Sequence, residues 1–242
     1  MKRMILFSVL FFLICLRSPF NANPEDHRNS EFEIVIIDVT DKDIAKYGRF
    51  PWGRDMYGKA LRSLNSYGAK GVFFDYILSE QDSRWPEKDN AFSDELKSSE
   101  IPVFLSYVFI KEGGKDNFPY DVRGIKVINA PHIRNLDQHV LPPIAQFAVN
   151  ATNMGFINVF MNEDNILKDI TTVLKWQNKY YPYIGVAIAS HFFNVPVDEV
   201  TLTGKTLRIG SVELELRDGA NFRPDFGRPF ERYKHFSYTD LL

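Results

Sequence analysis

Cysteine is nearly absent from this chain of 242 residues, and its one copy, Cys15, lies inside an apolar run. A lone cysteine excludes an intramolecular disulfide and a zinc site built from cysteine ligands. The five histidines stand at positions 27, 132, 139, 191 and 235, with no helical pair spacing for a metal. Stability must therefore come from packing, for which a composition of 45% hydrophobic and 14% aromatic residues is ample.

An excess of either charge is also missing. Lys and Arg total 29 against 31 Asp and Glu, a formal net charge of -2. Such a balance provides no long-range field for holding nucleic acid or anionic lipid, so nucleic acid is not expected as a partner. No internal repeat, Gly-x-Ser-x-Gly elbow or phosphate-binding Gly-Lys-Ser/Thr loop is present. The length indicates a single large domain or a domain with an appendage, and we expect one main domain.

The N-terminus carries the longest apolar run. Residues 4–16 follow the basic Met1-Lys2-Arg3 and are shorter than the roughly 20 apolar residues of a spanning helix. This pattern predicts a signal peptide over residues 1–22 that delivers the remaining chain across a membrane, most simply to a bacterial periplasm. Phe20-Asn21-Ala22 fits the small-x-small cleavage rule poorly, so a short uncleaved anchor in the inner membrane is an open alternative.

Residues 23–30 are polar and predict a linker, and the folded domain is expected from residue 31 to 242. Residues 32–40, 71–77 and 101–109 are apolar enough to form buried strands. Between them, Asp55 and Asp89 can each cap a helix, and Gly68 suits the left-handed end of the first helix. This βαβαβ start predicts an α/β fold with a mostly parallel central sheet flanked by helices.

The second half has a less regular pattern, and we expect it to be mixed or antiparallel. Extended pieces are predicted over residues 125–129, 155–161 and 171–176, with short antiparallel strands over residues 200–202, 207–209 and 212–216. A helix is predicted over residues 182–193. Ser237 caps a further helix, and the chain stops within a turn of its start. We therefore expect the domain to lack its C-terminal portion.

Candidate binding residues gather where the first strands end. Asp38 and Asp75 lie near the carboxyl ends of two strands, the edge at which open α/β sheets bind ligands. Arg49, Trp52 and Arg54 lie in the loop that leaves the first strand. Their guanidinium groups and indole suit a small anionic or aromatic ligand. In the structural alternative, Asp75 and Arg54 form a buried pair that fixes the loop, while Trp52 covers the sheet.

Several of these segments resemble the second type of CHASE domain, an extracytoplasmic sensory domain of bacterial cyclases, histidine kinases and related receptors. The most specific element is Gly-Arg-x-Pro-Trp-x-Arg, at Gly48–Arg54, between an Asp-ending strand and a helix. The other matching segments are Ile36-Ile37-Asp38 with Asp41, Gly68-Ala69-Lys70-Gly71-Val72-Phe73-Phe74-Asp75, Met154-Gly155-Phe156-Ile157-Asn158-Val159 and Tyr181-Pro182. Asp164-Asn165 departs from the Asp-Gly and Arg pair expected at the turn that follows.

The resemblance implies a periplasmic receptor domain that binds a small molecule without catalysis and needs no cofactor. Its expected partners are the ligand, a second copy of the chain, and a cytoplasmic output domain or partner receptor chain encoded outside this sequence. The competing hypothesis is a secreted metal-dependent phosphate-ester hydrolase with Asp38 and Asp75 as magnesium ligands. The phosphatase pattern of two aspartates one residue apart is missing, because Thr40 occupies the second position after Asp38.

Overall fold

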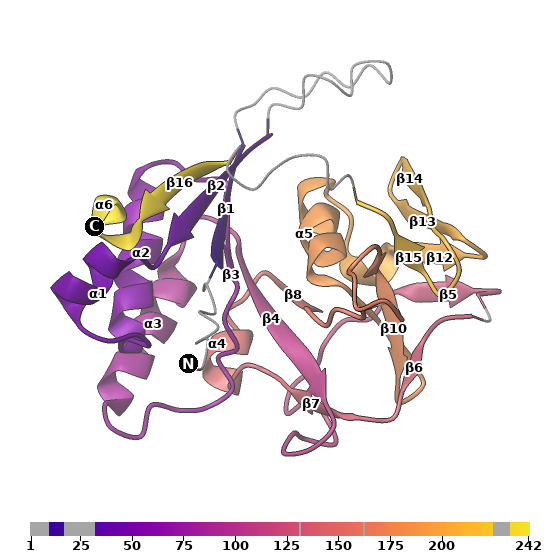
Figure 1. Cartoon of the computed structure of the whole chain (residues 1–242), viewed down its shortest axis with the longest axis horizontal. Helices are drawn as coiled ribbons and strands as arrows, with labels where there is room; N and C mark the ends of the chain where they lie inside the picture. Colours follow the sequence, from indigo (N-terminus) through magenta and orange to yellow (C-terminus); the bar gives the residue numbers. More distant parts are fainter. Residues whose placement is uncertain (1–9, 17–31, 131, 162, 225–232) are drawn as a thin grey trace. The chain divides into compact units, whose positions relative to one another are not determined.

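The computed structural model describes residues 10–16, 32–130, 132–161, 163–224 and 233–242. The chain divides into two compact units (Figure 1). Unit 1 comprises residues 1–76, 80–103 and 229–242, and unit 2 comprises residues 77–79 and 104–228.

The strands of unit 1 run in the order β16-β2-β1-β3. They are β1 (Leu10–Leu16), β2 (Phe32–Asp38), β3 (Gly71–Phe74) and β16 (Lys234–Ser237). β16 is parallel to β2, whereas β1 is antiparallel to both β2 and β3. The prediction of a parallel sheet is therefore only partly confirmed, because an antiparallel strand separates β2 from β3.

β1 is the unexpected strand of this sheet. Leu10 pairs with Asp38 and Leu16 with Phe32 along the whole of β2, and Phe11 pairs with Phe74 of β3. These residues belong to the run for which an export signal or short anchor is predicted. That role stays a prediction, and residues 1–9 and 17–22 lie outside the described residues. Within the described residues, no helix is both long and apolar enough to cross a bilayer.

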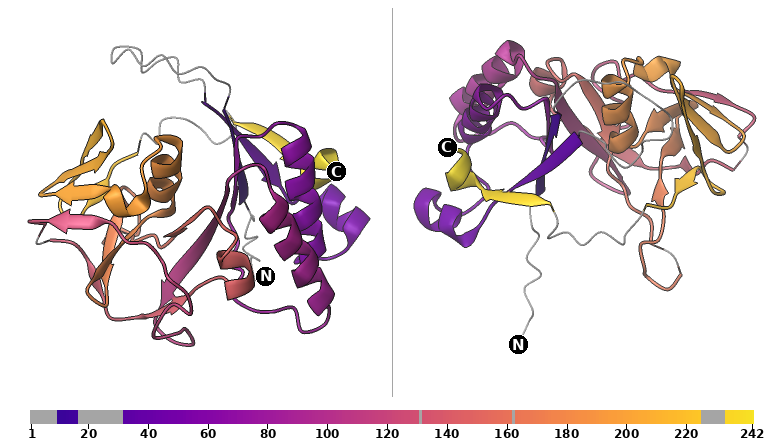
Figure 2. Two further views of the ribbon diagram at one scale, coloured as in Figure 1. Left: turned by 180° about the vertical axis from the view of Figure 1, so that it is seen from behind. Right: turned by 90° about the horizontal axis from the view of Figure 1, so that it is seen from above.

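Helices α2 (Arg54–Ser66) and α3 (Pro86–Ser98) lie on one side of the unit 1 sheet (Figure 2). They pack against each other closely, since a Cβ on Gly58 would lie 3.0 Å from Glu95 Cγ. Gly53 is the N-cap of α2, so Asp55 is the second residue of the helix and not its cap as predicted. Likewise α3 begins at Pro86, three residues before Asp89, which corrects the second predicted cap. Gly68 has the expected positive φ of 73° after α2.

Two shorter helices complete unit 1. α1 (Asp41–Tyr47) follows β2 directly, where the sequence predicted a loop. α6 (Tyr238–Leu241) follows β16, and Ser237 caps it as predicted, with its hydroxyl accepting from Asp240 N at 3.2 Å.

Unit 2 is built from short strands, as the irregular second half predicts. β4 (Val103–Ile110) enters it from residue 104 and pairs with β7 (His139–Leu141) antiparallel and with β8 (Asn153–Phe156) parallel. A second sheet has the order β14-β13-β12-β5: Val212–Glu215, Thr206–Ile209, Thr201–Thr203 and Lys126–Ile128. A third has the order β11-β10-β6: Lys179–Pro182, Val173–Trp176 and Asn135–Leu136. β15 (Asn221–Phe222) pairs with β9 (Ile170–Thr171).

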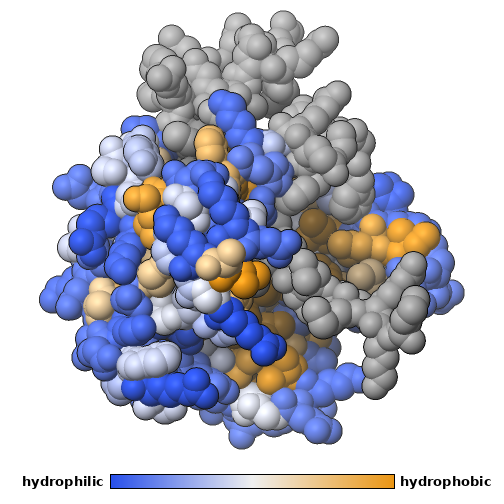
Figure 3. Space-filling view, turned by 60° about the vertical axis from the view of Figure 1, so that its left-hand side comes forward, coloured by the Kyte–Doolittle hydropathy of each residue, from blue (hydrophilic) through white to orange (hydrophobic). Residues whose placement is uncertain are grey.

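The helical elements of unit 2 are α4 (Ala145–Ala148), α5 (Ile184–Phe192) and the 3-10 turn η1 (Val197–Glu199). α5 packs tightly onto β8, because a Cβ on Gly155 would lie 2.5 Å from Ile184 Cα. An aromatic core forms around Tyr107 and Phe109, both buried, against Trp176 and Tyr181. Polar residues cover most of the face turned forward in Figure 3, with small apolar patches between them.

Candidate functional site

Asp38 closes β2, and its carboxylate is already engaged. Asp38 Oδ2 lies 2.6 Å from Nδ1 of His235 on β16, and both side chains are about a quarter exposed, at 22% and 27%. The register places Ser237, two residues after His235, opposite Asp38. The aspartate therefore joins β2 to β16, the last strand of the chain that the structure describes.

The Gly48–Arg54 loop is held by aromatic packing. Trp52 is 7% exposed, and its Nε1 donates to the Gly48 carbonyl at 2.8 Å. Its ring centroid lies 5.5 Å from Phe50 and 4.9 Å from Tyr238 of α6. Arg49, by contrast, is exposed and makes no hydrogen bond or ion pair with any residue that the structure describes. Among the described residues, Arg49 is thus the cation of the Gly48–Arg54 loop that has no partner.

Arg54 begins α2 and is surrounded by acceptors. Its Nε lies 3.9 Å from Oδ1 of Asp89, and the two side chains are 12% and 3% exposed. Its guanidinium lies over the ring of Tyr76, with Cζ 5.7 Å from the centroid, and Nη2 donates to the Glu80 carbonyl at 3.3 Å. The buried pair expected for Arg54 exists, but its acid is Asp89 and not Asp75.

Asp75 follows β3 and is partly buried. Its carboxylate has no hydrogen bond or ion pair among the described residues, and burial raises its pKa above the usual value. Its neighbour Tyr76 packs on Phe50, with ring centroids 5.9 Å apart. An unpaired carboxyl therefore lies one residue from the tyrosine on which the Gly48–Arg54 loop packs.

Asp38 and Asp75 do not meet, because β1 lies between their strands. Two strand spacings separate their backbones by about 9–10 Å. No group of three or more metal-binding side chains occurs among the described residues. The predicted site residues thus lie where β2 and β3 end, but the two carboxylates of Asp38 and Asp75 are not brought together.

Asp43 is a central polar residue of unit 1 that sequence reasoning missed. Its buried carboxylate accepts from Thr40 N at 2.8 Å and Thr40 Oγ1 at 2.6 Å, and from the amides of Tyr238 at 3.3 Å and Thr239 at 2.6 Å. Burial by itself would raise its pKa, but the hydrogen bonds from Thr239 and Thr40 hold the pKa below its usual value. Asp43 joins α1 to the start of α6.

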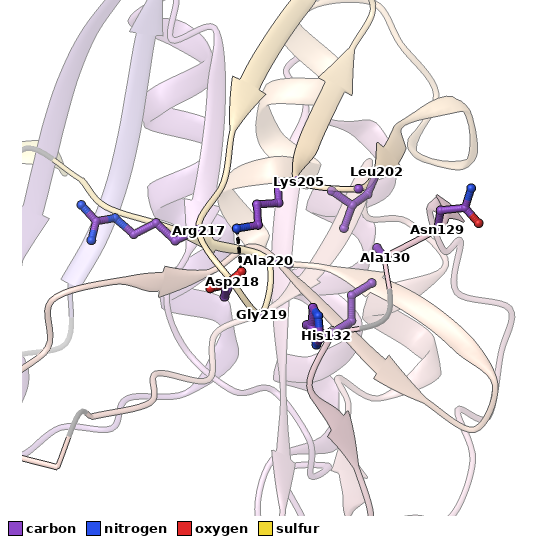
Figure 4. A pocket seen from close by; sticks show the side chains of 11 residues that line it. Asn129, Ala130, His132, Leu202, Lys205, Arg217, Asp218, Gly219 and Ala220 are labelled. Carbon is purple, nitrogen blue, oxygen red and sulfur yellow. Dashed lines mark ion pairs between the residues drawn. The ribbon is translucent and has the colours of Figure 1, made fainter.

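Unit 2 contains a cavity that sequence reasoning also missed (Figure 4). It has a volume of about 150 Å³ and lies among the segment after β5, the β12–β13 turn and the turn before β15. Its charged lining residues are Lys205, Arg217 and Asp218. Lys205 comes from the β12–β13 turn, whereas Arg217 and Asp218 are neighbours in the turn before β15, and only the tertiary fold brings the two turns together.

Comparison with known families gives one result. The model of the CHASE2 domain matches residues 8–242, which cover nearly the whole chain, β1 included. A search of curated proteins and of solved structures gives no match.

Proposed function

The chain belongs to the CHASE2 family of extracytoplasmic sensory domains, and from that premise we propose that it binds a small molecule in the periplasm without changing it chemically. Binding would be passed to an output domain in the cytoplasm or to a partner receptor chain. The family match supports the sensing role. The ligand and its site are argued from the strand-end residues of unit 1.

We place ligand contacts at Arg49 and Asp75, because these two members of the predicted site keep unpaired charged groups among the described residues. Arg54, Trp52 and Asp38 hold the surrounding backbone through Asp89, Gly48 and His235. The observation that carries this proposal is the partly buried carboxyl of Asp75, which has no partner among the described residues. A partly desolvated carboxylate without a partner costs stability, and such groups gather at binding and catalytic sites, so we assign Asp75 to ligand binding.

These groups define the ligand class. Arg49 can hold a carboxylate or phosphate through its planar fork of donors, and Asp75 can accept from a donor on the same molecule. Phe50 and Tyr76 provide aromatic surface beside them. A small polar or aromatic molecule with an anionic group fits this arrangement.

The route from this edge to the rest of a receptor would pass through the C-terminal elements. Trp52 contacts Tyr238 of α6, Asp38 holds His235 of β16, and Asp43 holds the first amides of α6. A ligand that moves the Gly48–Arg54 loop would therefore act on the end of the described chain. A second copy of the chain remains the expected partner for transmitting such a movement.

A thermal-shift screen of small-molecule ligands on the 242-residue chain tests this proposal. Hits should be repeated with Arg49→Ala and Asp75→Asn, and with Asp94→Asn as a matched control on the exposed face of α3. We expect the two site variants to lose the ligand-induced shift and the control to keep it. A shift that survives both site variants would remove Arg49 and Asp75 from the site.

A further inference from the structure

The unit 2 cavity is lined mainly by apolar groups with one charged wall. Leu202, Ile133, Ala130 and Ala220 contribute apolar surface. Leu202 and Ala220 belong to the hydrophobic core of this unit, and Ala130 and Ile133 pack against it. The cavity is thus anchored on packed core residues rather than formed by mobile side chains alone.

The charged wall is formed by Lys205 and its neighbours. Lys205 Nζ lies 2.7 Å from Asp218 Oδ1, an ion pair drawn as a dashed line in Figure 4. The hydrogen bond from Lys205 lowers the pKa of the Asp218 carboxyl, and nearby His132 has a smaller effect in the same direction. Both members of the ion pair are exposed, Lys205 at 58% and Asp218 at 79%.

Arg217 does not add to this wall. Its side chain extends away from Lys205 and His132 in Figure 4, and its Nε lies 3.8 Å from Asp169 Oδ1. Asp169 in turn accepts two hydrogen bonds from Arg223, at 2.9 Å each. The basic groups left at the cavity are therefore Lys205 and His132.

We propose that this cavity binds a small monocarboxylate with a short aliphatic body, with the carboxylate on Lys205 beside His132 and the aliphatic part against Leu202 and Ile133. An ammonium has three donors, so Lys205 can hold a ligand carboxylate while Asp218 turns toward solvent. This site is separate from the strand-end residues of unit 1, and its failure would leave the proposed sensing role unaffected.

The size and the lining of the cavity favour small monocarboxylates over other ligands. A volume of about 150 Å³ corresponds to about five water molecules, at roughly 30 Å³ each. That room suits about five to seven non-hydrogen atoms, such as propionate or butyrate, and is below the range of larger cofactors. A phosphate or a dicarboxylate would press its second charge against the apolar wall, which is unfavourable. An amine would meet Lys205 as a like charge.

The test is a titration of the full chain with sodium butyrate, followed by chemical shifts of backbone amides. Residues 202–205 and 217–220 should shift together, and butyramide, which has the same shape without the charge, should shift them far less. Absence of butyrate binding at millimolar concentrations, or equal binding of butyramide, would overturn the proposal.

Variants separate Lys205 from general charge effects. Lys205→Met should weaken butyrate binding about tenfold or more, the loss expected for a charge-assisted hydrogen bond. Asp218→Asn should strengthen binding, because it frees Lys205 and removes a repulsive carboxylate. Arg208→Met is the matched control, since it removes a cation from an exposed ion pair with Glu213 in the same sheet, and it should leave binding unchanged.

The outcome does not depend on one variant folding. If Lys205→Met does not yield folded protein, the stronger butyrate binding expected for Asp218→Asn still tests the assignment. Binding that is unaltered in Asp218→Asn, or that falls equally in Arg208→Met, would refute the assignment of the carboxylate to Lys205.

Discussion

Replacing Asp43 with asparagine should destabilise unit 1 strongly, although the substitution hardly changes the volume of the side chain. The buried carboxylate accepts four hydrogen bonds, two from Thr40 and one each from the Tyr238 and Thr239 amides. A carboxylate suits this surrounding because it offers acceptors on both oxygens and no donor. The amide that replaces it brings a donor into a site lined by donors.

The size of the effect follows from the geometry. Asparagine can keep its oxygen at the place of Oδ2, which serves Thr40 and Tyr238 N, and its NH2 group must then face Thr239 N. The Thr239 amide and the new donor are both left unsatisfied in a buried site, at about 1–3 kcal/mol each. We therefore expect a loss of about 2–6 kcal/mol in the free energy of unfolding.

Urea unfolding at several pH values measures this loss. The folded-state pKa of Asp43 is depressed, so its stabilisation is complete above the unfolded-state pKa of about 3.9 and is lost as the pH falls further. The difference between wild type and Asp43→Asn should be constant near neutral pH and should shrink in strong acid. Amide exchange of the peptide covering α6 should also accelerate in the variant.

Asp41→Asn provides the control, because Asp41 is exposed in the first turn of the same helix. Losing its interaction with the helix dipole should cost only about 0.3–1 kcal/mol. If Asp43→Asn were no more damaging than Asp41→Asn, the assignment of Asp43 as the link between α1 and α6 would be wrong.

Three further substitutions test other parts of the fold. Asp75→Asn should raise the melting temperature near neutral pH, because burial raises the pKa of that carboxyl and penalises its charged form; the gain over wild type should vanish as acid protonates Asp75, and an unchanged melting temperature would contradict this. Arg54→Met should cost about 3 kcal/mol in urea unfolding by leaving Asp89 buried without its cation, and the double variant with Asp89→Asn should lose less than the sum of the two single changes, whereas strict additivity would show that the pair is not coupled. Gly155→Ala should cost about 1–3 kcal/mol because its Cβ would meet the Ile184 backbone at 2.5 Å, whereas Gly185→Ala, whose Cβ would meet only the Tyr183 ring at 3.3 Å, should be close to neutral.

The local sequence pattern predicts most of the helices and strands whose apolar residues recur at helical spacing or form a continuous buried run. Strands near residues 32–38 and 71–74 and helices near 54–66 and 184–192 are confirmed within a few residues. Gly68 and Ser237 end and begin their helices as expected, since their roles depend on neighbouring residues alone.

Long-range pairing is what the sequence could not supply. β1 carries an unbroken apolar run, and such a run is compatible with a buried strand as well as with an export signal. The structural alternative pairs Arg54 with Asp75, but the buried acid beside Arg54 is Asp89 of α3, which also accepts from Asp82 N at 2.8 Å. Thr40, three positions away, supplies two of the hydrogen bonds to Asp43, but the amides of Tyr238 and Thr239 that link it to α6 lie nearly two hundred positions away, where no local pattern can indicate them.

The place of β1 has a practical consequence for producing this protein. A recombinant fragment that begins at residue 31 would retain β2 and β3 but would lack the strand that bridges them. Each would then present an unpaired backbone edge, which favours association between molecules. Removal of residues 1–22 by a signal peptidase would have the same effect on the sheet. Expression clones intended for ligand screening should therefore begin at or before residue 8, where the family match begins, and carry any affinity tag at the other end.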